Sequence, residues 1–237
     1  MGIPPLHGEV FDLSIRVGVA PQLARLMLLA SRGLDAKMQL AIGGALAVRD
    51  AGWGRHTDDL DIFARPVSAK RLVKALAKQG AKTHWITDSH AVVWLDEDNA
   101  ASIAAGEAPS VRIDVLSTVT EPEVSAIRTA IPARRLGVPL KVFHPDHLAA
   151  IKYLAGRPKD LLDFDELILR GVDVERVRYL VSIADEAQVS AMMVRIRKLK
   201  KPSSGVRDGR AQYLDREGFE RAFAAAVAAE RASAPRP

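Results

Sequence analysis

The sequence predicts an α+β fold in which a mixed β-sheet is flanked by helices and followed by a C-terminal helical region. Short apolar or alternating segments, which are typical of strands, fall between residues 37 and 116 and are separated by helical patterns. From Pro145 onward, almost every segment has helical periodicity. The 237 residues, of which 48% are hydrophobic, are enough for one large domain or two small ones with a buried core.

The N-terminal part of the chain holds all of the predicted strands. We expect helices at residues 20–32, 45–49 and 68–79, and strands at residues 37–42, 59–63, 82–87, 91–95 and 111–116. Ser68 is the expected N-cap of its helix, because its hydroxyl can accept a hydrogen bond from a free backbone amide. Gly43 and Gly44 end the first strand and are followed by good helix formers, so they are predicted to form a strand-to-helix turn.

The C-terminal part is predicted to be helical. Pro145 suits a first helical turn, Gly156 suits a helix end, and Pro158 suits the start of the next helix. The expected helices lie at residues 145–155, from residue 158 onward, and at residues 174–184, 189–199 and 215–229. We therefore divide the chain into a core at residues 1–144, a helical domain at 145–230 and a disordered tail without periodicity at 231–237.

Two acids separated by one apolar residue predict a metal site. On a strand, residues two apart point to the same face about 6.6 Å apart, so Asp59 and Asp61 present their carboxylates side by side. Asp114, in the alternating segment 111–116, is the expected third carboxylate. Such oxygen ligands suit Mg²⁺, with Mn²⁺ as an alternative, and Mg²⁺ usually completes its shell with water and substrate phosphates. The three aspartates therefore indicate phosphate chemistry.

The other candidate ligands have simpler explanations. The chain has no cysteine, which excludes disulfides, thiolate zinc sites and cysteine nucleophiles. Residues 96–98 are all acidic but follow an apolar run and precede Asn99, so we interpret them as a solvated turn. His144 and His147 lie at a helix start without a third ligand nearby, and we expect structural roles for them. With no apolar run of 18 residues and no leader sequence, we expect a cytoplasmic protein without membrane contact.

The residues also resemble a known superfamily. Three features are similar to the active-site signature of the polymerase-β-like nucleotidyltransferases: Gly43-Gly44, the pattern Thr57-x-Asp59-x-Asp61 and the lone acid Asp114. The segment from 138 to 163 resembles the second block of AbiEii-type nucleotidyltransferases. In that block a strand leads into a helix that carries a lysine, and an arginine, a Lys-Asp pair and another aspartate follow. Proteins of that type are often toxins of bacterial toxin-antitoxin pairs. Together the two blocks cover roughly residues 38 to 170.

This resemblance implies a polymerase-β-like nucleotidyltransferase fold and a set of site residues. Asp59, Asp61 and Asp114 would be the catalytic carboxylates and the Mg²⁺ ligands. The implied nucleotide- and phosphate-binding residues are Gly43, Gly44, Arg55, Thr57, Lys152, Arg157 and Lys159, and Asp160 and Asp163 complete the second motif. Arg55 either contacts a phosphate or pairs with Asp58. Many relatives have serine where this chain has Gly44, although backbone amides there could still bind a phosphate.

Two groups of charged residues allow two interpretations each. Arg157, Lys159, Asp160 and Asp163 belong to the nucleotide site or form a surface ion-pair network. Residues 195–210 carry seven basic residues against one acid, which suits either a nucleic-acid contact or a solvated helix end. The nucleic-acid patch of this second group consists of Arg195, Arg197, Lys198, Lys200 and Lys201, followed by Arg207 and Arg210.

The sequence therefore leads to a functional hypothesis with alternatives. We expect an Mg²⁺-dependent transferase that moves a nucleoside monophosphate from an NTP to an acceptor hydroxyl, with RNA or tRNA favoured over protein as the acceptor. An antitoxin protein is the expected partner if the chain is a toxin. The alternatives are a catalytically degenerate nucleotide- or RNA-binding protein and a transferase acting on a small molecule such as an antibiotic. An Asp-x-Asp pair alone also occurs in sugar-nucleotide glycosyltransferases and metal-dependent phosphatases.

Overall fold

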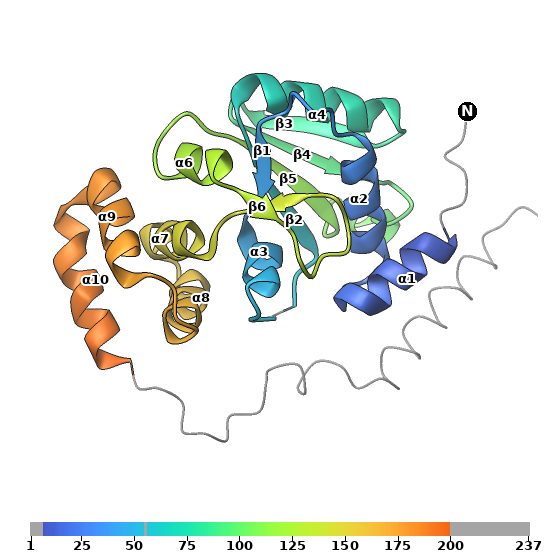
Figure 1. Ribbon diagram of the computed structural model, residues 1–237. Helices are drawn as coiled ribbons and strands as arrows, with labels where there is room; N and C mark the ends of the chain where they lie inside the picture. Colours follow the sequence, from blue (N-terminus) through green and yellow to red (C-terminus); the bar gives the residue numbers. More distant parts are fainter. Residues whose placement is uncertain (1–6, 55, 200–237) are drawn as a thin grey trace, which may run out of the picture. The chain divides into compact units, whose positions relative to one another are not determined.

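The computed structural model describes residues 7–54 and 56–199, and its centre is a seven-stranded mixed sheet (Figure 1). The strand order is β3-β4-β5-β2-β1-β7-β6. The strands are β1 (Leu40–Ile42), β2 (Asp59–Ala64), β3 (Lys82–Thr87), β4 (His90–Trp94), β5 (Arg112–Ser117), β6 (Ile131–Pro132) and β7 (Lys141–Val142). The expected mixed sheet is confirmed, because β2 runs parallel to β5 and antiparallel to β1.

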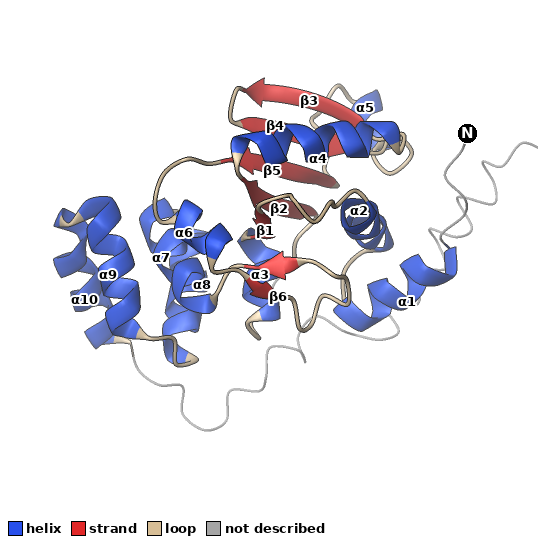
Figure 2. Ribbon diagram, turned by 45° about the horizontal axis from the view of Figure 1, so that its top comes forward, coloured by secondary structure: helices blue, strands red, loops and turns tan. Residues whose placement is uncertain are grey.

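Helices flank this sheet, as the sequence predicts. They are α1 (His7–Val17), α2 (Pro21–Arg32), α3 (Gly44–Asp50), α4 (Pro66–Lys78), α5 (Ala100–Ala104), α6 (Glu123–Arg128), α7 (Pro145–Ala155), α8 (Pro158–Leu169), α9 (Val174–Asp185) and α10 (Ala187–Lys198). Helices α2 and α4 lie across one face of the sheet (Figure 2), whereas α7 to α10 form a group beside it (Figure 1).

Strand β2 divides its side chains between the core and the site. Leu60, Ile62 and Ala64 are fully buried, and the alternate residues on the other face are half-buried. Burial of this apolar row stabilises the strand, since burying one large aliphatic side chain contributes about 1.5–3 kcal/mol. A shift of one residue would turn the row to the other face, so the core fixes which face carries Asp59 and Asp61.

The junction between α7 and α8 follows the sequence prediction. Gly156 ends α7 with φ +67°, a left-handed conformation that glycine adopts without strain, and Pro158 begins α8. The two helices pack together through Tyr153 and Phe164, whose ring centroids lie 5.1 Å apart. This packing brings the charged residues of the second motif beside one another.

The structure corrects one cap and adds elements that we did not expect. Helix α4 begins at Pro66, two residues before Ser68, and the Ser68 hydroxyl accepts a hydrogen bond from the Gln39 amide (2.8 Å) instead of capping the helix. The elements α1, α5, α6 and β6 were not expected, whereas β7 corresponds to the strand expected before the helix at 145–155. Strands of two residues, such as β6 and β7, are too short for a periodic pattern.

Two of the expected segments, the helix at 215–229 and the tail at 231–237, lie outside the described residues, and the boundary at 144/145 stays a prediction. No single helix in the part of the chain that the structure describes is long and apolar enough to cross a membrane. One bent pair, Gly8–Val17 with Pro21–Arg32, passes the same test by length and composition alone.

Candidate metal centre

Three aspartates from two neighbouring strands meet on the open face of the sheet. Asp61 on β2 stands directly beside Asp114 on β5, because the two strands are parallel and in register at these residues. Asp59 lies two residues earlier on the same face of β2. One carboxylate oxygen from each of the three residues lies within 4.8 Å of the others. This cluster is compatible with a divalent cation, since hard cations bind carboxylate oxygens.

The electrostatics of the cluster favour a bound cation. Burial, followed by the negative charges of Asp59 and Asp114, raises the pKa of Asp61 to about 6. The positive charges of Lys152 and Lys159 act in the opposite direction but do not cancel this effect. A divalent ion would neutralise the excess negative charge that the three carboxylates place at one point.

Two donors hold the carboxylate of Asp114. His90 Nε2 on β4 lies 2.8 Å from Asp114 Oδ1, and Arg112 Nε donates to Oδ2 at 3.0 Å. Val92 on β4 pairs with Asp114, so His90 occupies the diagonal position on the same face. The sequence analysis did not identify His90 as a site residue. Only the pairing of β4 with β5 brings it there.

Thr57 and the two glycines support the β2 carboxylates. The buried Thr57 hydroxyl donates a hydrogen bond to the Asp59 carboxylate, and the Gly43 amide donates to the Asp61 carbonyl oxygen (3.0 Å). Gly44 has φ +57°, and a Cβ at this position would overlap the Asp61 carboxylate. The turn therefore approaches Asp61 too closely for a side chain, which accounts for glycine at position 44.

The second motif forms a buried ion-pair network. Lys152 Nζ on α7 lies 2.7 Å from Asp160 Oδ1 and 2.9 Å from Asp163 Oδ2 on α8, and Arg157 also pairs with Asp160. Lys152 and both aspartates are almost completely buried, whereas Arg157 and Lys159 are exposed. The network thus differs from a surface one, because burial requires each charge in it to be compensated. Lys152 and Lys159 still act on Asp61 through their charge.

The predicted nucleic-acid patch is described only in part. Arg195 Nε and Nη2 lie 2.6 Å from Oδ1 and Oδ2 of Asp165, in a two-point ion pair within the helical region. Arg197 and Lys198 occupy the last turn of α10. Arg55, Lys200, Lys201, Arg207 and Arg210 lie outside the described residues.

Comparisons with known proteins yield only distant structural similarity. No protein-family model matches the chain, and no curated protein does. The solution structure of the antibiotic-resistance factor ANT(2″)-Ia is 15% identical, with 78% of this chain and 98% of that one covered and a TM-score of 0.49. An antigenic nucleotidyltransferase-like protein from Paracoccidioides brasiliensis is 17% identical over 80% and 98% of the two chains, with a TM-score of 0.46. These values assign neither a family nor a substrate to this chain.

Proposed function

We propose that the protein is an Mg²⁺-dependent nucleotidyltransferase of the polymerase-β-like superfamily. It transfers a nucleoside monophosphate from an NTP to an acceptor hydroxyl, with release of pyrophosphate. The observation that carries this proposal is the cluster of Asp59, Asp61 and Asp114 directly beside the turn at Gly44.

The three aspartates would hold the divalent ion. When bound, such an ion neutralises charge on the phosphates and lowers the pKa of the attacking hydroxyl. The surrounding residues orient the ligands: His90 and Arg112 fix both oxygens of Asp114, and Thr57 fixes Asp59. Such supporting hydrogen bonds matter because ligands held in one orientation need no reorganisation when the ion binds.

The phosphate-binding residues would lie on two sides of the carboxylates. The backbone of the turn at Gly44 lies against the Asp61 carboxylate and would meet a phosphate bound there, and the exposed Lys159 and Arg157 provide positive charge from the start of α8. Lys152 contributes positive charge from within its buried network, where it also holds Asp160 and Asp163 in place. These charges would stabilise the negative charge that develops on the leaving pyrophosphate.

For the acceptor we favour RNA or tRNA, with a protein hydroxyl as the alternative, and we infer an AbiEii-type toxin whose partner is an antitoxin protein. The segment from 138 to 163 supports this choice, since it carries the pattern of the AbiEii second block. A transferase acting on an antibiotic would need the same metal centre but a different acceptor surface.

The test is to incubate the purified protein with Mg²⁺ and each NTP, labelled at the α-phosphate, together with bacterial RNA, bacterial protein or an aminoglycoside. Label should appear in RNA with the wild type and not with Asp61→Asn. Asp96→Asn, which changes an exposed acid in a turn, should retain transfer. If no acceptor is labelled by a folded wild-type sample, or if Asp61→Asn is as active as the wild type, the proposal is wrong.

A further inference from the structure

A second group of positive charges lies at the far end of α3 from the carboxylates. The first residue of this helix, Gly44, touches Asp61, and Gly52 follows its last turn. At Gly52 two guanidinium groups converge: a Cβ there would lie 3.0 Å from Arg135 Nη1 and 3.4 Å from Arg170 Nη1. These arginines come from the segment between β6 and β7 and from the end of α8, so only the fold brings them together.

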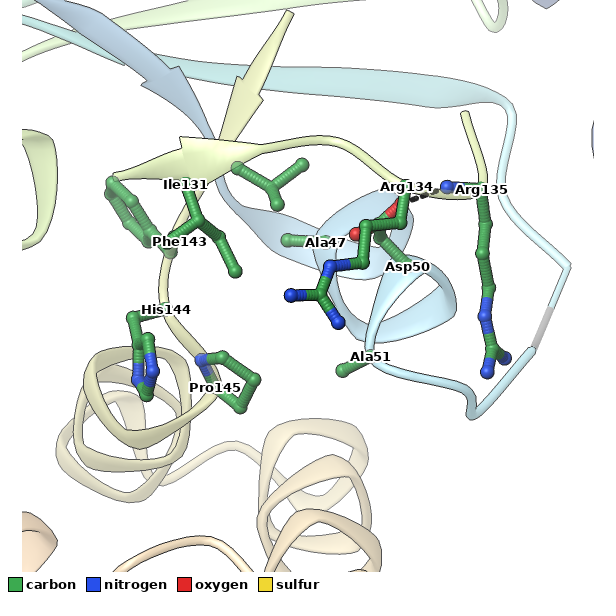
Figure 3. A pocket seen from close by; sticks show the side chains of 10 residues that line it. Ala47, Asp50, Ala51, Ile131, Arg134, Arg135, Phe143, His144 and Pro145 are labelled. Carbon is green, nitrogen blue, oxygen red and sulfur yellow. Dashed lines mark hydrogen bonds between the residues drawn. The ribbon is translucent and has the colours of Figure 1, made fainter. Parts of the chain in front are cut away.

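An aromatic ring and a pocket accompany these arginines. The Arg170 guanidinium lies 5.7 Å from the centroid of the Trp53 ring, and Trp53 is only partly buried. Arg134, next to Arg135, extends its guanidinium into a pocket of about 290 Å³ (Figure 3). The pocket wall is polar and apolar in about equal parts: Ala47, Ala51, Ile131 and Phe143 line it together with charged side chains, and His144 is at its edge.

The positive charge of this group is only partly balanced by carboxylates of the described residues. Within residues 7–54 and 56–199, neither Arg134 nor Arg135 forms an ion pair, and the nearest carboxylate to Arg170 is Glu166, at 3.8 Å from its Nε. Asp50 also lines the pocket, but it is 8% exposed and accepts a hydrogen bond from the backbone amide of Arg135 (2.6 Å), shown dashed in Figure 3. Three guanidinium groups therefore share a surface with little negative charge.

Arginines arranged in this way fit phosphate groups. The planar guanidinium donates two parallel hydrogen bonds to a phosphate, and it remains charged at any physiological pH. Arg135 and Arg170 converge on one place, whereas Arg134 reaches into the adjacent pocket, so the surface offers more than one phosphate position. A partly exposed indole beside such charges is typical of surfaces on which a base of a single strand stacks.

We propose that Arg134, Arg135, Arg170 and Trp53 bind the phosphodiester backbone of a single-stranded nucleic acid. This inference rests on the proposed function in one respect: the strand would be the acceptor whose terminal hydroxyl reaches the carboxylates. Helix α3 has seven residues and is therefore about 10 Å long, so a short strand can span the distance between the two sites. The arginines would hold the acceptor strand by its backbone, independently of its sequence.

The test measures binding in the absence of NTP and divalent ions, so that it does not depend on transfer. Fluorescence anisotropy with a labelled single-stranded RNA gives the dissociation constant at a series of salt concentrations. In the double variant Arg135→Gln/Arg170→Gln, affinity should fall at least tenfold at 100 mM salt. A plot of the logarithm of the association constant against the logarithm of the salt concentration has a negative slope. The magnitude of this slope should decrease by about 1.4 in the double variant, since each of the two lost phosphate contacts on a single strand contributes about 0.7.

A matched control keeps the change in net charge constant. Arg32 and Arg178 are also exposed arginines, but they pair with Glu9 and Glu175 at 2.6 Å, and Arg32→Gln/Arg178→Gln should leave the slope unchanged. Equal slopes for the wild type and the Arg135/Arg170 variant would overturn the inference, as would an equal loss in both double variants. It would also be overturned if the Arg135/Arg170 variant lost only the binding of free triphosphate.

The same experiment separates this inference from the proposed function. Wild-type transfer to RNA with an unchanged salt slope in the Arg135/Arg170 variant would refute the binding surface alone. Conversely, a reduced slope in a protein that never transfers a nucleotide would refute the transferase and support the surface.

Discussion

The structure contains two groups of carboxylates with opposite surroundings: the partly buried group on β2 and β5 and the fully buried group on α8. Asp59, Asp61 and Asp114 place three negative charges within 4.8 Å of one another. Asp160 and Asp163 instead contact the ammonium group of Lys152 at 2.7 and 2.9 Å. The first cluster is therefore a group of like charges, and the second is a compensated ion-pair network.

The pKa values of the two clusters shift in opposite directions. Burial and the neighbouring carboxylates raise the pKa of Asp61 to about 6. Burial also acts to raise the pKa of Asp160, but hydrogen bonds from Lys152 and Arg157 outweigh it, and the pKa is lowered. Burial acts to raise the pKa of both groups, and the results are opposite because the neighbouring charges differ in sign.

The difference indicates what each cluster does. Like charges held together destabilise the folded protein, so their presence indicates a ligand that compensates them. A compensated buried pair stabilises one arrangement of helices, because removing either partner leaves an unpaired charge. We therefore assign chemistry to the sheet cluster and support of α7 and α8 to the helical one.

Replacing Asp61 should have the largest effect on activity. We expect Asp61→Asn to lower nucleotidyl transfer by at least about 10³-fold, because the cation loses a ligand between the other two carboxylates. The free energy of unfolding without metal should not decrease, since the amide removes repulsion from Asp59 and Asp114. Initial rates and urea titrations in EDTA measure the two quantities. A variant that is inactive because it is unfolded would contradict this prediction.

Replacing Lys152 should have the largest effect on stability. Lys152→Met should lower the free energy of unfolding by about 3–5 kcal/mol, because it removes the buried ammonium group that both Asp160 and Asp163 contact. Urea titration at pH 7 measures the loss. Lys159→Met, at an exposed position of α8, should change stability by less than about 0.5 kcal/mol.

Further substitutions check the cause of the Lys152 effect. Adding Asp160→Asn and Asp163→Asn to Lys152→Met should recover most of the lost stability, because no unpaired buried charge then remains. A triple variant that is no more stable than Lys152→Met would show that the packing of the lysine chain, rather than its charge, matters.

The raised pKa of Asp61 predicts how stability depends on pH in the metal-free protein. Between pH 6 and about 3.9, the ordinary aspartate pKa, the folded state binds more protons at Asp61 than the unfolded state does. As the pH falls through this range, the wild type should therefore gain stability relative to Asp61→Asn. The free energy of unfolding of the wild type minus that of the variant should rise by at most about 3 kcal/mol. His147, whose pKa burial lowers to about 4, is not among the charges that act on Asp61, so its contribution is the same in both proteins and cancels.

Paired urea titrations in EDTA at several pH values measure this difference. Below pH 3.9 it should become constant, because Asp61 is then protonated in both states. A difference that stays constant between pH 7 and 4 would contradict the assignment of Asp61 to an uncompensated cluster.

Changing the support of Asp114 should have the smallest effect of the four. We expect His90→Gln to reduce divalent-cation affinity or transfer rate by about 10–100-fold, a loss typical of residues that orient a metal ligand. Titration with Mn²⁺ and initial rates measure the change. His84→Gln, on the exposed side of β3, is the matched control and should behave as the wild type. Equal effects of the two histidine variants would show that His90 does not support the site.

The sequence by itself determined the features that depend on short spacing along the chain. Asp59 and Asp61 share a face because side chains alternate along a strand, and Gly156 and Pro158 mark a helix junction through their backbone preferences. The strand with Asp114 could be recognised from its alternating pattern, and the glycine turn from its place between a strand and a helix. Each of these signals lies within a few residues.

The tertiary structure decided which distant residues meet. Sheet pairing brings His90 to Asp114, α7 and α8 enclose Lys152 with its two aspartates, and Arg135 meets Arg170 at Gly52. It also decided that Ser68 binds the Gln39 amide rather than capping its helix. Such contacts depend on strand order and helix packing, which local patterns do not encode, because they are set by burial of the whole core.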